Sequence, residues 1–230
     1  MKKKVLFSIV TLIMIITSIL GYTPIVNAMT DTNMIEDGML NTARPSQQFL
    51  SSVPLSTNGV VTELIYIPHH NEFRVYHTNN FEQFAYDNNC GPTLATNIIS
   101  YYKTLGFYLY SGPVINQKMY NEICSLVEYT PSGGTDAKKV YKAVQAYAER
   151  AGYSFERDVY WLNTWGDVTR DIKRGYTVIG YDDSHGYFIV GYRIMDGVKQ
   201  LYVCTGWDNP EYEWINFKDA KFKMESMHVY

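Results

Sequence analysis

Cys90 has the sequence surroundings of a reactive thiol. It follows the polar pair Asn88-Asn89 and precedes Gly91 and Pro92, and the apolar spacing beyond them predicts a helix that begins here. Proline suits the first helical turn, because the N–H that it lacks would have no partner there. The partial positive charge of a helix N-terminus favours the thiolate, the nucleophilic form of cysteine. Gly91 is expected to leave the backbone beside the sulfur open to a substrate.

A thiolate nucleophile needs a base beside it, and His185 is the candidate among the five histidines. It stands directly before Gly186 and the apolar run 187–190, which predicts a strand. A strand end is a rigid mount for a side chain that must reach a helix start elsewhere in the fold. Each residue has a plainer alternative: a buried cysteine that packs at a helix start, and a turn histidine at the mouth of a hairpin.

Other chemistries find no support in the sequence. The three cysteines are far apart, and His69-His70 would point to opposite sides of a strand, so no spacing resembles a zinc site. There is no glycine-rich phosphate loop and no Gly-x-Ser-x-Gly sequence. We therefore expect no metal and no cofactor. The net charge is −3 without a basic patch, which argues against a nucleic acid partner.

The N-terminus has the pattern of a secretory signal peptide. Lysines occupy positions 2–4, an apolar run covers residues 5–20, and residues 26–28 (Val-Asn-Ala) suit a signal peptidase. We expect residues 1–28 to be this peptide and the protein to be secreted, either extracellular or associated with the cell wall. The apolar run is short for a spanning helix, so we expect no stable membrane insertion after cleavage. A retained membrane anchor is the alternative.

The rest of the chain is expected to have two parts. Residues 29–75 start as a polar stretch without apolar periodicity and predict an extended or pro-like segment, while residues 76–230 predict one folded domain. An exported protein can form disulfides. A bond between Cys124 and Cys204 is the pairing that would leave Cys90 free. The alternative is that both are small buried thiols.

Apolar periodicity and turn residues predict the elements that position the two chemical groups. Helices are predicted over residues 90–105, 119–127, 136–151 and 164–174, the last one capped by Thr164. Strands are predicted over residues 60–67, 73–76, 177–181, 187–193, 201–204 and 214–217, with a hairpin at Asp196-Gly197. Helices precede the main run of strands, which predicts an α+β fold rather than alternating α/β.

Two local sequences resemble those of bacterial papain-like cysteine peptidases. Residues 89–97, Asn-Cys-Gly-Pro-Thr-Leu-Ala-Thr-Asn, resemble the nucleophile helix in the branch related to the peptidase domain that trims double-glycine leader peptides from bacteriocins. Residues 185–192, His-Gly-Tyr-Phe-Ile-Val-Gly-Tyr, resemble the histidine strand of that branch. The strand over residues 175–180 and the sequence Thr205-Gly206-Trp207 also fit, and the resemblance covers residues 81–217.

The resemblance implies a papain-like α+β fold with an N-terminal helical subdomain that carries Cys90. A C-terminal antiparallel sheet would carry His185, and a groove would lie between the two subdomains. It also implies that Cys90 attacks an amide carbonyl to form a thioester, while His185 accepts the thiol proton and later protonates the leaving amine.

The resemblance further implies two groups that stabilise the oxyanion, namely the backbone N–H of Cys90 and an upstream side-chain amide. The family carries Gln at the position that Phe84 occupies here. Gln83 is therefore the candidate, with Asn88 or Asn89 as substitutes.

A larger departure concerns the group that orients the histidine. The family has Asp or Asn two residues before the Trp, where this chain has Thr205, and Asp208 is the nearest carboxylate in sequence. The sequence thus predicts a secreted cysteine hydrolase that cleaves peptide or isopeptide bonds of a peptide or protein substrate. Two alternatives stay open: a thiol amidohydrolase acting on cell-wall peptides, and a weak or inactive papain-like shell that serves as a secreted binding or effector protein.

Overall fold

A computed structural model describes residues 59–81, 88–182 and 184–230 of the chain. Gln83, the predicted signal peptide and residues 29–58 of the predicted N-terminal segment lie outside the described residues. Among the residues that are described, no helix is long and apolar enough to cross a membrane.

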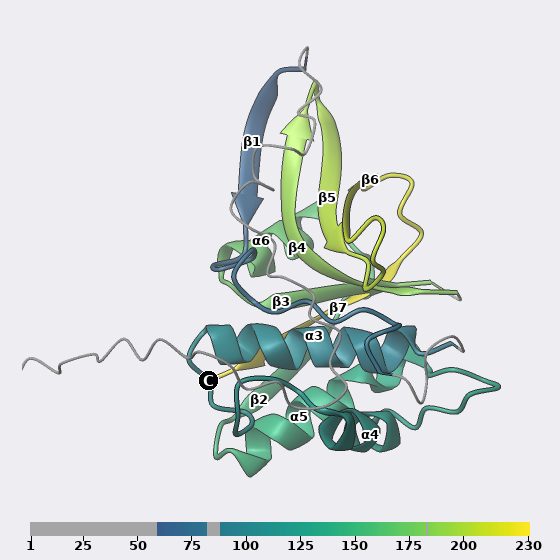
Figure 1. Ribbon diagram of the computed structural model, residues 1–230. Coiled ribbons are helices and arrows are strands. Elements are labelled where there is room, and N and C mark those ends of the chain that lie inside the picture. The colour runs from purple at the N-terminus through teal and green to yellow at the C-terminus, as the bar shows by residue number, and fades with distance from the viewer. Residues whose placement is uncertain (1–58, 82–87, 183) are drawn as a thin grey trace, which may run out of the picture. The chain divides into compact units, whose positions relative to one another are not determined.

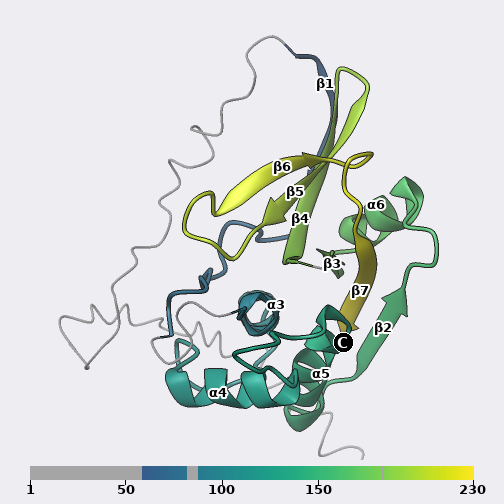
Figure 2. The same ribbon diagram turned by 90° about the vertical axis from the view of Figure 1, so that its right-hand side faces the viewer.

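The described ranges contain α3 (Cys90–Thr104), α4 (Gln117–Leu126), α5 (Val140–Arg150) and α6 (Trp165–Lys173), with a short 3-10 turn, η2 (Ala137–Lys139), before α5. The α3 helix is buried from Gly91 to Tyr102. This follows from its position between the sheet on one side and α4 and α5 on the other (Figures 1 and 2). As predicted, Thr164 caps α6, because its Oγ1 accepts the backbone N–H of Asp167 at 3.1 Å.

The strands form one antiparallel sheet in the order β2-β7-β3-β4-β5-β6, and β1 also pairs with β4. Their bounds are β1 (Val61–Tyr66), β2 (Phe155–Val159), β3 (Thr177–Tyr181), β4 (Gly186–Met195), β5 (Val198–Cys204), β6 (Tyr212–Asn216) and β7 (Lys223–Val229). The predicted α+β fold, with helices that carry Cys90 and an antiparallel sheet that carries His185, is confirmed.

The long strand β4 organises the sheet. Its first half pairs with β3, its second half pairs with β1, and β5 runs along its other edge. Because β1 belongs to this sheet, residues 61–66 of the predicted N-terminal segment are part of the same folded unit. Asp196 and Gly197 both have positive φ, 50° and 76°, which is the geometry of a tight hairpin and matches the predicted turn between β4 and β5.

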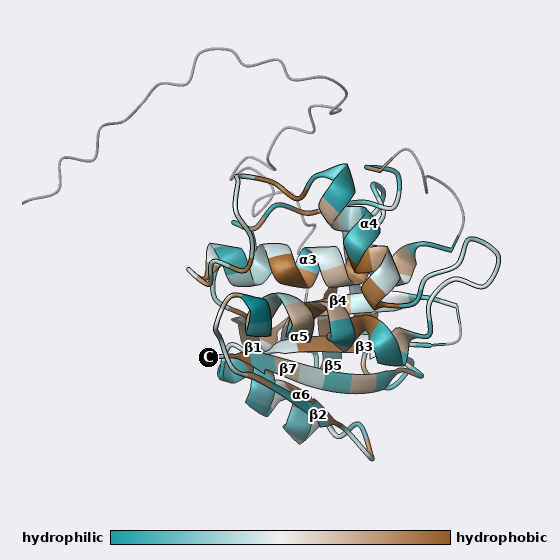
Figure 3. Ribbon diagram, turned by 90° about the horizontal axis from the view of Figure 1, so that it is seen from below, coloured by the Kyte–Doolittle hydropathy of each residue, from teal (hydrophilic) through white to brown (hydrophobic). Residues whose placement is uncertain are grey.

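An aromatic cluster fixes α3 against β4. Phe73, Tyr101 and Phe188 lie with their ring centroids 5.5–5.7 Å apart, and all three side chains are buried. Each such pair contributes about 0.5–1.5 kcal/mol beyond the burial of its area. The Tyr102 hydroxyl adds a hydrogen bond to the carbonyl of Met227 at 2.7 Å. Figure 3 shows hydrophobic residues along α3 and the strands beneath it, while α4 and α6 are largely hydrophilic.

The sequence patterns did not predict β2 and β7. Charged residues interrupt the alternation in both strands, and Glu225 in β7 is fully buried, where an apolar residue would be expected. Its carboxylate accepts hydrogen bonds from Arg157 in β2, one of them from Nε at 2.9 Å. The two strands are thus joined by an ion pair between a partly exposed Arg157 and a buried Glu225, and apolar periodicity cannot indicate such strands.

The predicted strand over residues 73–76 is wrong. The backbone N–H and C=O of Tyr76 bond to the side chain of Asn97 at 2.7 and 2.9 Å, and the carbonyl of Arg74 accepts from Ser100 at 2.8 Å. Side chains of α3 thus satisfy the backbone groups that a neighbouring strand would otherwise bind.

Candidate active site

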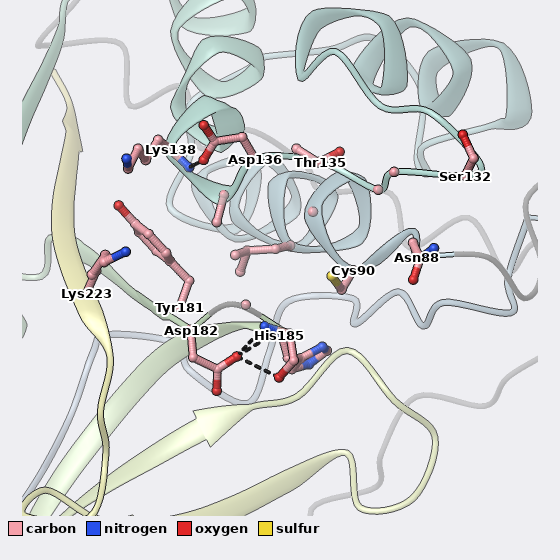
Figure 4. A pocket seen from close by; sticks show the side chains of 17 residues that line it. Asn88, Cys90, Ser132, Thr135, Asp136, Lys138, Tyr181, Asp182, His185 and Lys223 are labelled. Atoms are coloured by element: carbon pink, nitrogen blue, oxygen red, sulfur yellow. Dashed lines mark hydrogen bonds between the residues drawn. The ribbon is translucent and has the colours of Figure 1, made fainter.

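A cavity of about 530 Å³ contains both predicted catalytic residues. Its walls are the start of α3 with Cys90, the loop over residues 132–138, and the ends of β3, β4 and β7 (Figure 4). His185 lies directly before β4, on the sheet side of the cavity. The structure therefore brings together the helix start and the strand start that the sequence predicted to carry the chemistry.

Cys90 is the first residue of α3 and is partly exposed. Burial raises the pKa of its thiol above the usual value, although backbone N–H groups of Gly186, Gly91 and Cys90 itself face the sulfur and oppose the shift. The sequence predicted that the helix terminus would favour the thiolate. In the folded protein the loss of solvation outweighs that effect, so the thiol rests in its protonated form and depends on a base.

His185 is 7% exposed and is held on three sides. Its Nε2 lies 2.7 Å from the carbonyl oxygen of Thr205, the ring of Trp207 lies 4.2 Å away, and Tyr187 contacts it edge-on at 4.7 Å. A carbonyl oxygen only accepts, so Nε2 carries the proton and Nδ1 keeps the free lone pair. Burial lowers the pKa of His185, while the Thr205 carbonyl opposes this, and the ring therefore rests neutral with Nδ1 as the basic nitrogen.

The two side chains line one cavity, but no hydrogen bond joins the Cys90 thiol to the His185 ring; the ring's hydrogen bond goes to Thr205. Contacts between catalytic groups are often long without substrate and shorten when it binds. Transfer of the thiol proton to Nδ1 would therefore require the two side chains to move into hydrogen-bonding geometry.

Thr205 contacts His185 through its main chain, whereas the sequence comparison suggested its side chain. The hydroxyl donates to the carbonyl of Pro210 at 2.5 Å and accepts the backbone N–H of Trp207 at 3.0 Å. A carbonyl fixes the ring orientation as a carboxylate would, but it brings less negative charge to an imidazolium.

Asp208, the second candidate for orienting His185, turns to a different histidine. Its carboxylate lies 2.5 Å from Nδ1 of His77 and also accepts from the side chain of Asn79. The loop after β5 directs it there. Asp208 is therefore not the residue that orients His185.

Asp182 was missed by the sequence analysis. Its Oδ1 accepts the backbone N–H of His185 at 2.8 Å, and the N–H and hydroxyl of Ser184 at 2.7 Å each (Figure 4). Burial alone would raise its pKa, but these hydrogen bonds hold the pKa of Asp182 below its usual value. Asp182 thus fixes the turn that carries His185. The sequence Asp-Asp-Ser at residues 182–184, just before a predicted strand, is a turn signal that could have identified it.

Gly91 has a different role from the predicted one. A Cβ at this position would lie 2.6 Å from Cβ of Thr135, so the loop over residues 132–138 occupies the space that the glycine leaves. Gly91 therefore allows close packing of this loop on α3, rather than leaving the backbone open to a substrate.

The end of the cavity away from Cys90 is polar. Figure 4 shows Lys138, Lys223 and the hydroxyl of Tyr181 there, with Asp136 beside Lys138. Charges of both signs therefore meet at this end.

The predicted oxyanion groups are only partly described. Gln83 lies outside the described residues. Asn88 lines the cavity, and its Nδ2 contacts the carbonyl of Pro131 at 3.4 Å. Asn89 instead donates to the carbonyl of Thr78 at 2.6 Å. Of the two substitutes, Asn88 has the better position for an oxyanion.

All three cysteines are free thiols, so the suggested Cys124–Cys204 disulfide is not present. Burial raises the pKa of Cys124 to about 12, and it does the same for Cys204. Both behave as small buried apolar residues. Within the described ranges, no group of three or more His, Cys, Asp or Glu side chains is arranged to hold a metal ion.

No protein-family model matches the sequence, and no curated protein matches it. Among solved structures, the fold is similar to the peptidase domain of Streptococcus ComA, a bifunctional ABC transporter involved in a quorum sensing pathway. That match has a TM-score of 0.37 and 13% identity, and it covers 62% of this chain and 90% of the other. The fold is also similar to UfSP from C. elegans, with a TM-score of 0.49 and 13% identity, over 80% of this chain and 36% of the other. Neither likeness bears on activity or substrate.

Proposed function

We propose that the protein is a secreted cysteine hydrolase that cleaves peptide or isopeptide bonds through a thioester on Cys90. The observation that carries the proposal is the shared cavity, in which Cys90 opens a helix and His185 precedes a strand, with Nε2 of His185 tied to the Thr205 carbonyl. This tie leaves Nδ1 as the base for the thiol.

The reaction would begin from a neutral pair. Nδ1 of His185 takes the thiol proton as Sγ attacks the amide carbon, and the backbone N–H of Cys90 supports the oxyanion, together with an upstream amide, Gln83 or Asn88. The C–N bond breaks, and the imidazolium gives its proton to the leaving amine. Water, deprotonated by the same nitrogen, then attacks the thioester and releases the acid and the thiol.

Catalysis is expected to be slower than in an enzyme with a full triad, because His185 has a carbonyl partner rather than a carboxylate. A Cys-His pair can work without a strong third group, since a thiolate forms more readily than an alkoxide. A secreted binding protein built on an inactive shell is the second candidate, and the same carbonyl partner favours it.

The test compares the purified protein with its Cys90→Ala and His185→Ala forms on a peptide library, an isopeptide-linked substrate and peptidoglycan. We expect release of fragments by the wild type alone. Cleavage confined to peptidoglycan would identify a cell-wall amidohydrolase. If all three proteins leave every substrate intact, the hydrolase proposal is wrong and the binding shell remains.

A further inference from the structure

His77 is a buried histidine that lies outside the cavity and between two carboxylates. It is 7% exposed, its Nε2 bonds to Glu211 at 2.8 Å, and its Nδ1 lies 2.5 Å from Asp208 without forming a hydrogen bond. Its backbone N–H donates to the side chain of Asn80 at 2.6 Å. The proposed reaction does not use this ring. Its contacts with Asp208 and Glu211 nevertheless restrict the movement of the chain segment that carries these two carboxylates.

Both carboxylates belong to the loop that holds His185. This loop, residues 205–211, connects β5 to β6 and supplies the Thr205 carbonyl on Nε2 and the Trp207 ring on the imidazole face. The loop closes on itself, because the N–H of Thr205 donates to the carbonyl of Glu211 at 2.9 Å. The contact of His77 with Glu211 therefore also restrains Thr205, which is hydrogen-bonded to Glu211.

The segment of His77 is bonded to the helix side of the site as well. The N–H of Thr78 donates to the carbonyl of Gly206 at 3.0 Å, and the carbonyl of Thr78 accepts from the side chain of Asn89, the neighbour of Cys90, at 2.6 Å. An unbroken series of hydrogen bonds thus runs from the start of α3, through Thr78, to the loop that orients His185.

From these contacts we infer that residues 77–80 form a brace that sets the position of His185 relative to Cys90, with His77 as a positioning residue for the proposed reaction. Through main-chain groups, the brace fixes the orientation of the imidazole ring, which a single carboxylate does in a complete triad. The contribution to catalysis rests on the proposed function, whereas the effect on His185 does not.

The first measurement follows the His185 ring itself by NMR titration, which requires no activity. His77→Ala removes the contact with Glu211, and His77→Gln keeps one amide donor toward it. In the wild type the His185 midpoint lies below the usual 6.5, because the ring is buried under Trp207. We expect His77→Ala to move it up toward 6.5 as the loop loosens and water reaches the ring, and His77→Gln to move it less.

Glu211→Gln tests the same brace from its other end and guards against a His77 variant that fails to fold. The matched control is Glu72→Gln, because Glu72 pairs with the exposed His69 at 2.9 Å, away from the site. This control should leave the His185 midpoint unchanged. If the midpoint also stays at its wild-type value in folded His77→Ala and in Glu211→Gln, the brace is refuted, whether or not the protein is an enzyme.

The second measurement is kinetic. Misplacing a catalytic group by about 1 Å costs on the order of 100-fold in rate, so we expect kcat to fall roughly 10- to 100-fold in His77→Ala while KM stays within about twofold. A role in folding alone would lower the melting temperature and leave kcat of the folded fraction intact. A shifted His185 midpoint in a protein without Cys90-dependent activity would support the brace and refute the hydrolase.

Discussion

The chemistry of single residues rests on a neutral thiol and a neutral imidazole. Burial disfavours both charged forms, raising the pKa of Cys90 and lowering that of His185. In this respect the site differs from one with a preformed thiolate-imidazolium pair. In the proposed reaction the proton therefore moves from the thiol to the imidazole only after substrate has bound.

The protonation state gives a testable pH dependence. Because the pKa of Cys90 is raised, its thiolate should form only above the ordinary range for cysteine, about 8.5. Iodoacetamide should therefore modify native Cys90 slowly at pH 6, and the rate should climb as pH passes that value. The thiolate absorbance difference between wild type and Cys90→Ala should follow the same curve. A thiolate signal at pH 6, with a rate that is already constant there, would show a preformed ion pair instead.

A second prediction at the residue scale concerns the substitution of Asp182. Asp182→Asn keeps the size of the side chain and one acceptor oxygen but removes the charge beside His185. We expect kcat/KM to fall roughly 10-fold, because a neutral acceptor holds the backbone N–H of His185 less strongly than a carboxylate does and no longer stabilises an imidazolium. Asp196→Asn is the control, because Asp196 also accepts a backbone N–H, that of Val60 at 2.8 Å, but follows the end of β4 that is remote from His185. An equal loss in both variants would contradict the assigned role of Asp182.

Among the elements, α3 and β4 matter most for the proposed chemistry, because Cys90 is the first residue of α3 and His185 directly precedes β4. The rings of Phe73, Tyr101 and Phe188 hold the two elements together. The loop over residues 132–138 completes the cavity wall, and Thr135 in this loop approaches α3 closely at Gly91.

Gly91→Ala tests that approach. The new Cβ would lie 2.6 Å from Cβ of Thr135, so the loop must move away from α3. We expect a loss of about 1–3 kcal/mol in unfolding free energy, as for other overpacked sites, together with lower activity. Thr135→Gly in the same chain should restore part of both. Gly166→Ala is the matched control, since Gly166 is also the second residue of its helix and a Cβ there would lie 3.7 Å from Oγ1 of Thr164, an ordinary contact distance.

The strands β2 and β7 are joined by the buried pair of Arg157 and Glu225. Arg157→Met leaves the Glu225 carboxylate buried without its partner and is expected to lower the unfolding free energy by about 3–5 kcal/mol. The double variant Arg157→Met/Glu225→Leu replaces the pair by apolar groups and should recover most of that loss. Chemical denaturation of the two variants measures the difference. If the double variant is as unstable as the single one, packing rather than the unpaired charge causes the loss.

At the scale of the molecule, the described residues form one hydrophobic core without a covalent crosslink among the three cysteines. Reducing agents should leave the melting temperature unchanged. Intact-mass analysis after brief alkylation above pH 8.5 should find a single label on the native protein, at Cys90, and three labels after denaturation, because Cys124 and Cys204 are buried. A mass lower by two hydrogens, or a melting temperature that falls on reduction, would instead indicate a disulfide.

The sequence alone was sufficient for features that depend on local chemistry. The α3 start at Cys90, the cap at Thr164, the hairpin at Asp196-Gly197 and the strand after His185 were all predicted, because each follows from residues within a few positions of one another. The α+β class followed from the order of those elements.

The tertiary structure decided what depends on distant contacts. It chose the main-chain carbonyl of Thr205 rather than a side chain as the partner of His185, and a carbonyl group leaves no signature in the sequence, since every residue has one. It turned Asp208 toward His77, and it placed β7 between β2 and β3. Burial then reversed the expected protonation of Cys90, because the solvation of a thiol depends on the whole fold around it and the helix terminus supplies only a local field.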